Sequence, residues 1–525
     1  MTRRWTWLAL ASIGLVVLLG LGWTGQRALA DEADVEGAGV ESAAASETAS
    51  DVDEEPAAAS SDEAPEDPVG VSPSDSQPPP TSALVESASR VRVKLDVEGE
   101  LFATAGRDAP PVRRPISVDA CFDFIESPPS GAADRTVVRR YRDATADLRI
   151  DGEPRRTSLA ADARTLRVSL RGTTPLPYLD DAFLSRDERD LLETPFDPLL
   201  LDALRPAAPV VADESWDVPA DVVAGLLAID TVESGGITAR LADVADGVAT
   251  VRIAGIVDGA ADGVPAHVTV DGSFTVSATS GTSGSAVLDG RVAGVTVTLR
   301  ERREASHVAP GFDVEARLAI ARAATDEAAE IDTPPNEDAA TPHRRRGPGR
   351  AGLVWHRDAA GRYDLVHDDR WRVIEDGADG LVMRMVDSGA LVAQCVITPL
   401  SRAAAGSAPA IAEVERDIER SLAGQFGRIE HASEAERSDG VRIARVVTSG
   451  RADGLPFRWI HQVLTDAAGH RLSVTCMLEA SMEKRFGNAD RELVDGVGLP
   501  GGAAADGERS PGDRAARLPT ESRMP

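Results

Sequence analysis

The sequence is poor in several side chains on which enzyme chemistry depends. Among 525 residues it has 3 cysteines, 3 tyrosines and 8 histidines, and its only lysines are Lys94 and Lys484. So few thiols and imidazoles leave little material for a metal cluster or a proton-transfer site. Arginine supplies nearly all the positive charge, which together with abundant alanine, glycine and aspartate indicates genome composition bias without a functional message.

Positive charge is also scarce relative to negative charge. The chain has 86 Asp plus Glu against 56 Lys plus Arg, which gives a net charge of −30. A surface this acidic repels phosphate backbones and anionic lipids over most of its area, so general nucleic-acid binding is disfavoured. A chain of 525 residues is expected to hold at least two domains, because one domain usually has about 100 to 200.

The N-terminus has the layout of a secretory signal peptide. A short basic stretch precedes an apolar run over residues 5–23, and Ala28-Leu29-Ala30 forms a small-x-small cleavage site. We therefore expect residues 1–30 to be removed and the chain to be exported to the periplasm or cell envelope. The alternative is that residues 5–23 remain as a membrane anchor, since their length approaches that of a bilayer span and tryptophan lies at both ends.

Three further segments lack the pattern of folded structure. From Asp31 to Ser82 there are 15 Asp plus Glu and no Lys or Arg, a composition that cannot bury enough apolar surface to order itself, so residues 31–85 are predicted to be a disordered acidic tether. Residues 324–351 are predicted to be an interdomain linker, and residues 500–525 a disordered tail. The arginine run in the linker is expected to neutralise the leader or a neighbouring surface.

Residues 86–323 are predicted to form a mainly β domain. Val91, Val93, Leu95 and Val97 alternate with charged residues, and further segments repeat this period of two up to about residue 320. One polar face on each strand indicates an antiparallel sheet with one side in water. Asp271-Gly272 and Asp289-Gly290 are expected to be tight turns between strands.

A helical insertion is predicted within this sheet. Ser185 with Glu188 fits a capping box, Asp197-Pro198 fits the start of a second helix, and a third is predicted near residues 220–227. The second helix is strongly apolar, with Leu199, Leu200, Leu201 and Leu204. These four leucines either line a lipid-sized cavity under the curved sheet or simply fill the core. The arrangement resembles the half-barrel of periplasmic lipoprotein-carrier and lipid-binding proteins.

Residues 352–499 are predicted to form a smaller domain of antiparallel sheet and helices. Strands are expected at 371–374, 381–386, 391–398, 441–448, 457–464 and 472–478. Helical spacing relates Ile411, Val414, Ile418, Leu422 and Phe426, and again Met482, Phe486, Ala489, Leu493 and Val497. Together with the first domain, this combination is typical of the α+β class.

The second domain resembles the PsbP-type fold. The resemblance rests on Tyr363-Asp364-Leu365 before Trp371, on three strands followed by a helix, and on Leu472-Ser473-Val474-Thr475-Cys476 before a terminal helix. That family includes exported and membrane-associated accessory subunits and small lipoproteins, generally without catalytic residues. The resemblance implies an accessory or binding role for residues 353–497. It transfers no functional residue, and Asp369-Arg370 stands where a Pro-Gly pair usually precedes the tryptophan.

Cys395 and Cys476 are the one cysteine pair with matching strand positions. Both alternate with apolar neighbours, so both thiols are expected to point into one core. In an oxidising compartment they are a candidate disulfide, and the alternative is two buried free cysteines. No catalytic residue, metal site or cofactor site is predicted, because the histidines are scattered and Gly281-Thr282-Ser283-Gly284-Ser285 lacks the register of a serine-nucleophile turn.

Two functions from different classes follow from these observations. The first is an exported accessory or interaction protein of the cell envelope that has no catalytic activity and acts on an unknown envelope protein. The second is a carrier or sensor that binds an apolar, lipid-like ligand in the β-rich domain. Under the second hypothesis we expect an apolar concavity between the first sheet and residues 199–204.

Overall fold

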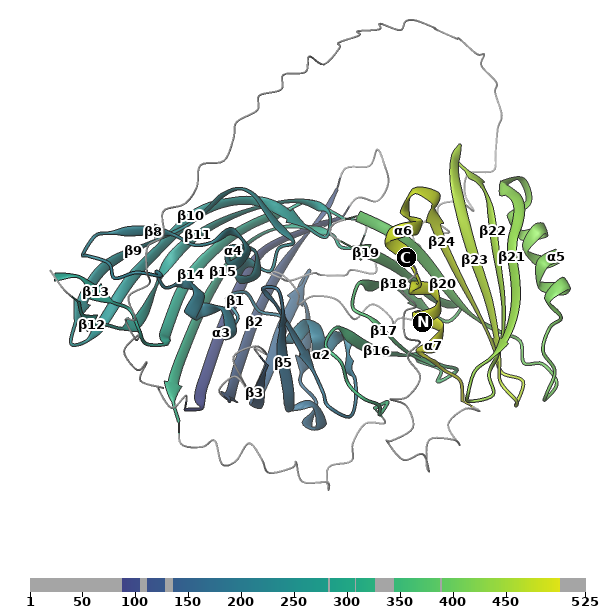
Figure 1. The fold of residues 1–525 in the computed structure, drawn as a ribbon, viewed down its shortest axis with the longest axis horizontal. Helices are drawn as coiled ribbons and strands as arrows, with labels where there is room; N and C mark the ends of the chain where they lie inside the picture. The colour runs from purple at the N-terminus through teal and green to yellow at the C-terminus, as the bar shows by residue number, and fades with distance from the viewer. Residues whose placement is uncertain are drawn as a thin grey trace, which may run out of the picture. The chain divides into compact units, whose positions relative to one another are not determined.

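The computed structural model describes residues 87–103, 111–127, 136–281, 284–306, 308–325, 344–387 and 390–500. The predicted signal peptide or anchor, the acidic tether, most of the linker and the tail beyond residue 500 lie outside the described residues. The described part is mainly antiparallel β-sheet with a few short helices (Figure 1), in agreement with the α+β class. None of its helices combines the length and the apolar character needed to cross a membrane.

The first half of the described chain forms a 12-stranded antiparallel sheet. The strand order is β6-β5-β3-β2-β1-β15-β14-β11-β10-β9-β8, and β4 pairs with β3. Its strands are β1 (Ser89–Ala103), β2 (Val112–Glu126), β3 (Val137–Ile150), β4 (Glu153–Ser158), β5 (Thr165–Arg171), β6 (Thr174–Tyr178), β8 (Ser215–Asp217), β9 (Thr231–Ala245), β10 (Val248–Ala261), β11 (Val264–Ser277), β14 (Val292–Arg303) and β15 (Gly311–Ala324). A separate hairpin joins β12 (Thr279–Ser280) to β13 (Ala286–Val287).

The predicted alternation of buried and exposed residues is confirmed in this sheet. In β1, Val91, Val93, Leu95 and Val97 are at most 4% exposed and belong to the large core cluster, whereas the charged residues between them are exposed or half-buried. One face of the sheet therefore carries the core, and the other faces water.

Three short helices pack against the buried face (Figure 1). They are α2 (Arg186–Leu191), α3 (Pro198–Leu201) and α4 (Ala220–Leu227). The predicted capping box is present, because the Ser185 hydroxyl accepts the amide of Glu188 and the Glu188 carboxylate accepts the amide of Ser185. Asp197 caps α3 through the amide of Leu199, and Pro198 occupies the first helical position, as its fixed φ allows.

One predicted turn is wrong. Asp271-Gly272 lies inside the continuous strand β11, opposite Ala254 and Ile253 of β10. A Cβ atom on Gly272 would lie 2.3 Å from the carbonyl oxygen of Thr296, so this glycine permits close approach of β14 and does not form a turn. The actual turn between β10 and β11 is Asp262-Gly263, where both residues have positive φ.

The second half contains a seven-stranded antiparallel sheet with the order β18-β19-β20-β24-β23-β22-β21. The strands are β18 (Trp371–Gly377), β19 (Gly380–Asp387), β20 (Ala390–Leu400), β21 (Phe426–Glu436), β22 (Arg442–Ala452), β23 (Leu455–Thr465) and β24 (Arg471–Glu479). Its helices are α5 (Ile411–Leu422), α6 (Glu483–Phe486) and α7 (Ala489–Asp495). Figure 1 shows α5 beside β21, and its residues Val414 and Ile418 join a small core with Val446 of β22.

Sequence patterns misplaced two features of this half. The helical repeat ends at Leu422, and Phe426 opens β21, an edge strand that was not predicted because most of its side chains are exposed and polar. The expected closing helix is divided at Gly487, which has a φ of +56°, so α6 and α7 are separate. Val497 then belongs to a short strand, β25 (Val497–Gly498).

A third, four-stranded sheet connects the two halves. Its order is β25-β17-β16-β7, with β7 (Leu184–Ser185), β16 (Leu353–Arg357) and β17 (Asp364–Asp368). The strand β7 comes from the helical insertion of the first half and pairs in parallel with β16 of the second half. The described residues accordingly belong to one compact unit. We call the region formed by α2 and the β16–β17 hairpin the junction.

Candidate functional site

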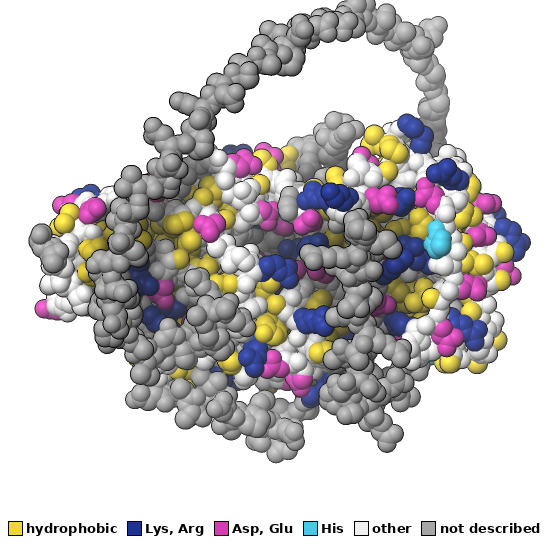
Figure 2. Space-filling view, in the orientation of Figure 1, with side chains coloured by type: hydrophobic (Ala, Val, Ile, Leu, Met, Phe, Trp, Pro, Cys, Tyr) yellow, Lys and Arg dark blue, Asp and Glu magenta, His cyan; other side chains and the backbone are white. Residues whose placement is uncertain are grey.

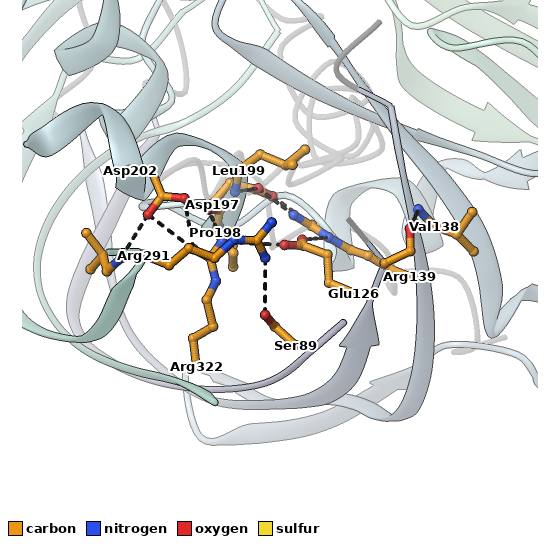
Figure 3. Close-up of polar contacts among 12 residues, drawn as sticks. Ser89, Glu126, Val138, Arg139, Asp197, Pro198, Leu199, Asp202, Arg291 and Arg322 are labelled. Atoms are coloured by element: carbon orange, nitrogen blue, oxygen red, sulfur yellow. Dashed lines mark hydrogen bonds and ion pairs between the residues drawn. The ribbon is translucent and has the colours of Figure 1, made fainter. Parts of the chain in front are cut away.

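A buried network of ion pairs fixes α3 to the first sheet (Figure 3). The Arg139 guanidinium on β3 donates to Glu126 of β2 at 2.9 Å and to both carboxylate oxygens of Asp197 at 2.6 and 2.8 Å. All three side chains are at most 4% exposed. Burial lowers the pKa of Arg139, but Asp197 and Glu126 outweigh burial and hold this pKa well above its usual value.

Arg322 on β15 contacts both ends of α3. Its Nη2 donates to the carbonyl oxygen of Pro198 and lies 3.4 Å from Glu126, and its Nη1 lies 3.3 Å from a carboxylate oxygen of Asp202. Asp202 also accepts the backbone amide of Val292 at 2.8 Å. Arginines from β3 and β15 thus hold the start and the end of α3 against the sheet.

The four leucines predicted as cavity-lining residues lie beside this network. Leu200, Leu201 and Leu204 are at most 2% exposed and belong to the core cluster, and Leu199 packs against it. Two cavities are described below, and none of these leucines lines either one. This burial is what the core-filling alternative expects of these residues.

A charged cleft of about 240 Å³ lies at the junction. Its walls come from β3, β5 and β6, from α2 and α4, and from β18 and β19. Six arginines and six carboxylates line it, namely Arg139, Arg171, Arg186, Arg189, Arg370 and Arg372 with Glu193, Asp197, Asp230, Asp262, Asp369 and Asp387. In the view of Figure 2, basic and acidic side chains stand close together in the middle of the molecule. This cleft was not predicted from the sequence.

Two arginines of α2 form part of the cleft wall and use few of their donors. Arg186 donates to Asp190 at 3.0 Å and to the carbonyl oxygen of Asp369 at 3.2 Å. Arg189 donates to Glu193 at 3.2 Å. Arg186 Nη2 and Arg189 Nε are buried and find no hydrogen-bond partner. A guanidinium offers five N–H donors, so both side chains keep unused hydrogen-bonding capacity.

Carboxylates at the junction have raised pKa values. Burial raises the pKa of Asp262 and of Asp190 to about 6, in each case against nearby arginines. Burial and the neighbouring Asp190 and Glu188 raise the pKa of Asp187 to about 7. Burial also raises the pKa of Asp369, against the opposing effect of Arg189. The nearest cation to Asp262 is Arg372, at 3.9 Å.

The junction also concentrates buried polar atoms that lack partners. Of eleven such side-chain atoms in the described residues, seven belong to α2 or to the β16–β17 hairpin, those of Arg186, Arg189, Asp190, Trp355, His356, Tyr363 and His367. Each buried polar atom without a partner costs about 1–3 kcal/mol. Burial lowers the pKa of His367 to about 3, so this histidine is neutral at pH 7.

The linker arginines bind neighbouring carboxylates, as predicted for a neutralising role. Arg344 pairs with Glu188 at 2.7 Å and with Asp162 at 2.9 Å, both in the first half. Arg345 pairs with Asp364 of β17 at 2.7 Å. Consecutive arginines therefore attach the end of the linker to both halves. Part of the linker's charge run, His343, lies outside the described residues.

A second cavity of about 350 Å³ lies within the second half, between β21–β24 and the α6–α7 segment. Its polar wall includes Arg458, which pairs with Glu430 at 2.6 Å and with Glu483. Arg445 pairs with Asp490 at 2.8 Å. These arginines are engaged with carboxylates, and this cavity offers fewer unused donors than the junction cleft.

In the described part of the chain, two kinds of arrangement bear on catalysis: side chains that could hold a metal ion, and a histidine near a carboxylate and a serine. No three His, Cys, Asp or Glu side chains there are placed to hold a metal ion. His267 contacts Asp258 at 2.6 Å, and Ser234 lies 3.3 Å from the other oxygen of the same carboxylate. The serine therefore contacts the acid and not the imidazole, so His267 is not placed to activate it as a nucleophile.

Cys395 and Cys476 lie directly opposite each other on β20 and β24. Both are completely buried in one core, as the strand pattern predicted, and both are free thiols in the structure. A hydrogen bond to Cys395 and burial raise the pKa of Cys476 well above its usual value. Cys121 is free and exposed. The pair matches the free-thiol alternative in this structure.

Two solved structures are similar to parts of the chain. A solution structure of cyanobacterial PsbP (CyanoP) from Synechocystis sp. PCC 6803 covers 29% of this chain and 95% of its own, with 12% identity and a TM-score of 0.24. A lipovitellin structure on lipid-protein interactions covers 50% of this chain and 27% of its own, with 8% identity and a TM-score of 0.23. At these scores neither likeness defines a function. No family model and no curated protein matches the chain.

Proposed function

We propose that this protein is an exported accessory protein of the cell envelope that works by binding and not by turnover. The observation that supports this proposal is the burial of the α3 segment against the first sheet. Leu201 and Leu204 of the α3 segment are fully buried there, and Arg139 and Arg322 hold the segment in place. A sheet whose helical insertion is buried and held in this way serves as a rigid support for the surfaces around it.

The energetics of the ion pairs favour a support over a carrier. To admit a lipid-sized ligand beneath α3, the chain would have to move Asp197 away from Arg139 and expose the leucines. Separating a buried, hydrogen-bonded ion pair costs on the order of 3–5 kcal/mol, because a charge is left without its partner. Exposure of the leucines adds about 1.5–3 kcal/mol for each one.

The sequence supports the remaining parts of the proposal. The basic start, the apolar run and the small-x-small site before Asp31 favour export. The PsbP-type pattern of residues 353–497 favours an accessory role, and the scarcity of histidine and cysteine favours binding over catalysis. We propose the periplasm or cell envelope as the location, with an envelope protein as the partner.

A carrier of apolar ligands is the second candidate. The observation that favours it is that α2, α3 and α4 all lie on the concave face of a long curved sheet, where a lipid would bind if α3 moved (Figure 1). The resemblance of the sequence to lipoprotein carriers rests on the same arrangement. The two candidates differ in whether the full chain contains lipid.

Native mass spectrometry and lipid extraction of the full chain distinguish these candidates. An accessory protein should show the mass of the polypeptide alone, and in-cell crosslinking should give a discrete protein partner. Lipid bound at one molecule per chain would overturn the first proposal and establish the carrier. As a matched control, Leu204→Ala opens space beneath α3, so lipid that appears only in this variant reflects the mutation and supports the accessory role.

A further inference from the structure

The junction cleft has unused donors on one part of its wall. Arg189 is 5% exposed, yet its guanidinium makes a single hydrogen bond among the described residues, from Nη1 to Glu193. Its Nε is buried without a partner, and so is Nη2 of the neighbouring Arg186. Guanidinium groups with free donors in a fixed fork are suited to bind a carboxylate.

Carboxylates with few hydrogen bonds form another part of the wall. Asp262 has its nearest cation, Arg372, at 3.9 Å, which is beyond hydrogen-bonding distance. Asp230 lies beside Asp262 and accepts the amides of Asp262 and Gly263. Burial raises the pKa of both carboxyl groups against the opposing charge of Arg303. An ammonium group in the cleft would give Asp262 a hydrogen-bonded cation.

Apolar side chains form a smaller part of the cleft wall. Leu176, Leu192, Ile229 and Val386 line it between the charged groups. The cleft volume of about 240 Å³ is below the range of drug-sized ligand sites, which favours a small ligand.

We propose that the junction cleft binds an aliphatic α-amino acid as a zwitterion. Its carboxylate lies against Arg186 and Arg189, its ammonium group lies against Asp262 and Asp230, and its side chain contacts Leu192 and Ile229. This ligand site goes beyond the accessory role proposed above and does not depend on it. A simple anion would leave the carboxylates without a cation, and a simple amine would leave the arginine donors unused.

Calorimetric titration of the full chain with matched compounds tests this proposal. The probes are L-valine, isobutylamine, which lacks the carboxylate, and isovalerate, which lacks the ammonium group. We expect valine to bind at least tenfold more tightly than either single-charged compound, because each of these loses one of the two charged contacts. L-leucine and L-isoleucine test the size of the apolar portion.

Two variants assign the contacts. Asp262→Asn keeps the turn, because asparagine also accepts positive φ, and should weaken valine binding at least tenfold. Arg189→Lys keeps the charge but loses the guanidinium fork, and should weaken it by a similar factor. Asp258→Asn is the matched control, because Asp258 is an exposed carboxylate on β10, the strand that ends just before Asp262, and should leave binding unchanged.

Each other outcome overturns the proposal. Equal binding of isobutylamine would make the cleft a cation site, and equal binding of isovalerate would make it an anion site. No detectable heat with any of the three aliphatic amino acids would leave the cleft without this function. If valine binds but Asp262→Asn and Arg189→Lys bind it as tightly as the parent chain does, the site lies elsewhere. None of these results bears on the lipid measurement, so the accessory role is judged separately.

Discussion

The network beneath α3 and the junction cleft are both built from arginine and carboxylate side chains, but they differ in how completely those side chains are paired. Arg139 finds three carboxylate oxygens within 2.9 Å, one from Glu126 on β2 and two from Asp197 at the start of α3. Arg189, which is equally buried, finds one at 3.2 Å. Paired charges of the first kind hold elements together, whereas charges of the second kind are available for another molecule.

The difference follows from what each region joins. The network lies within one core, where β2, β3, β15 and α3 pack closely and each charge has a partner, and only Nε of Arg322 is a buried donor without one among its described residues. The junction lies where the two halves meet through the short β7–β16 pairing, the linker arginines and other polar contacts. Interfaces between domains are smaller and more polar than cores, so they leave space and unused hydrogen-bonding groups.

Replacing Arg139 should have the largest effect. Arg139→Leu leaves Glu126 and Asp197 buried without their main cation, so we expect the free energy of unfolding to fall by about 3–5 kcal/mol. Urea unfolding of the full chain measures this loss. Arg92→Leu on the exposed face is the matched control and should change stability by less than about 0.5 kcal/mol. A loss below about 1 kcal/mol for Arg139→Leu would show that α3 is not held by this pair.

Asp262→Asn should have an intermediate effect that depends on pH. Because the folded-state pKa of Asp262 is about 6, above its unfolded value of about 4, the folded state gains stability as pH falls and loses it as pH rises through about 6. The variant lacks this titration. At pH 8 it should therefore be more stable than the parent chain by about 1–2 kcal/mol, and this advantage should disappear near pH 4.

The comparison between parent and variant is needed because buried histidines act in the opposite direction. Burial lowers the folded-state pKa of His367 to about 3 and that of His461 to about 4. The folded state therefore loses stability as pH falls below about 6.5, where these histidines become protonated in the unfolded chain. The difference between the two unfolding curves at each pH cancels this shared contribution. A difference that is constant from pH 8 to pH 4 would contradict the assigned pKa of Asp262.

Arg189→Met should have a smaller effect on stability. The substitution removes one hydrogen bond and an unpaired buried donor while keeping an unbranched side chain, so we expect a change within about 1 kcal/mol. Thermal unfolding is sufficient to measure it. If Arg189→Met lost as much stability as Arg139→Leu, the two regions would not differ in this respect. The arginines of the junction would then be structural.

The smallest expected effect concerns the alkylation of the two buried thiols, which we compare between the folded and the denatured chain. It involves no change in stability. Cys395 and Cys476 are partners of each other in a filled core, so we expect them to resist alkylation in the folded chain and both to react in denaturant without reductant. Cys121 is exposed and serves as the internal control that reacts first. If only Cys121 reacts in denaturant, the pair is a disulfide, and the predicted cross-link is confirmed.

Local sequence signals predicted much of the fold but not the cleft. The capping box at Ser185 and the Asp197-Pro198 helix start were identified because caps depend on residues close in sequence. The strand β7 was missed because two residues carry no periodicity, and its partner β16 lies about 170 residues later. The cleft likewise combines residues far apart in sequence, from Arg139 to Asp387, so Arg189 and Asp262 had no signal beyond their charge.

The meeting of β1 with β15 at the centre of the first sheet has a consequence for how the chain folds. Residues 89–103 of β1 take one of their two neighbours from residues 311–324. During synthesis, every ribosome-bound chain shorter than about 320 residues leaves both β1 and β14 with an open edge. Pairing of such distant segments makes folding slow, so these two edges stay open for most of the time that the sheet takes to be synthesised. The position of β15 between β1 and β14 makes the finished sheet continuous. For the same reason, the two open edges of the nascent chain need protection from other strands until β15 has emerged.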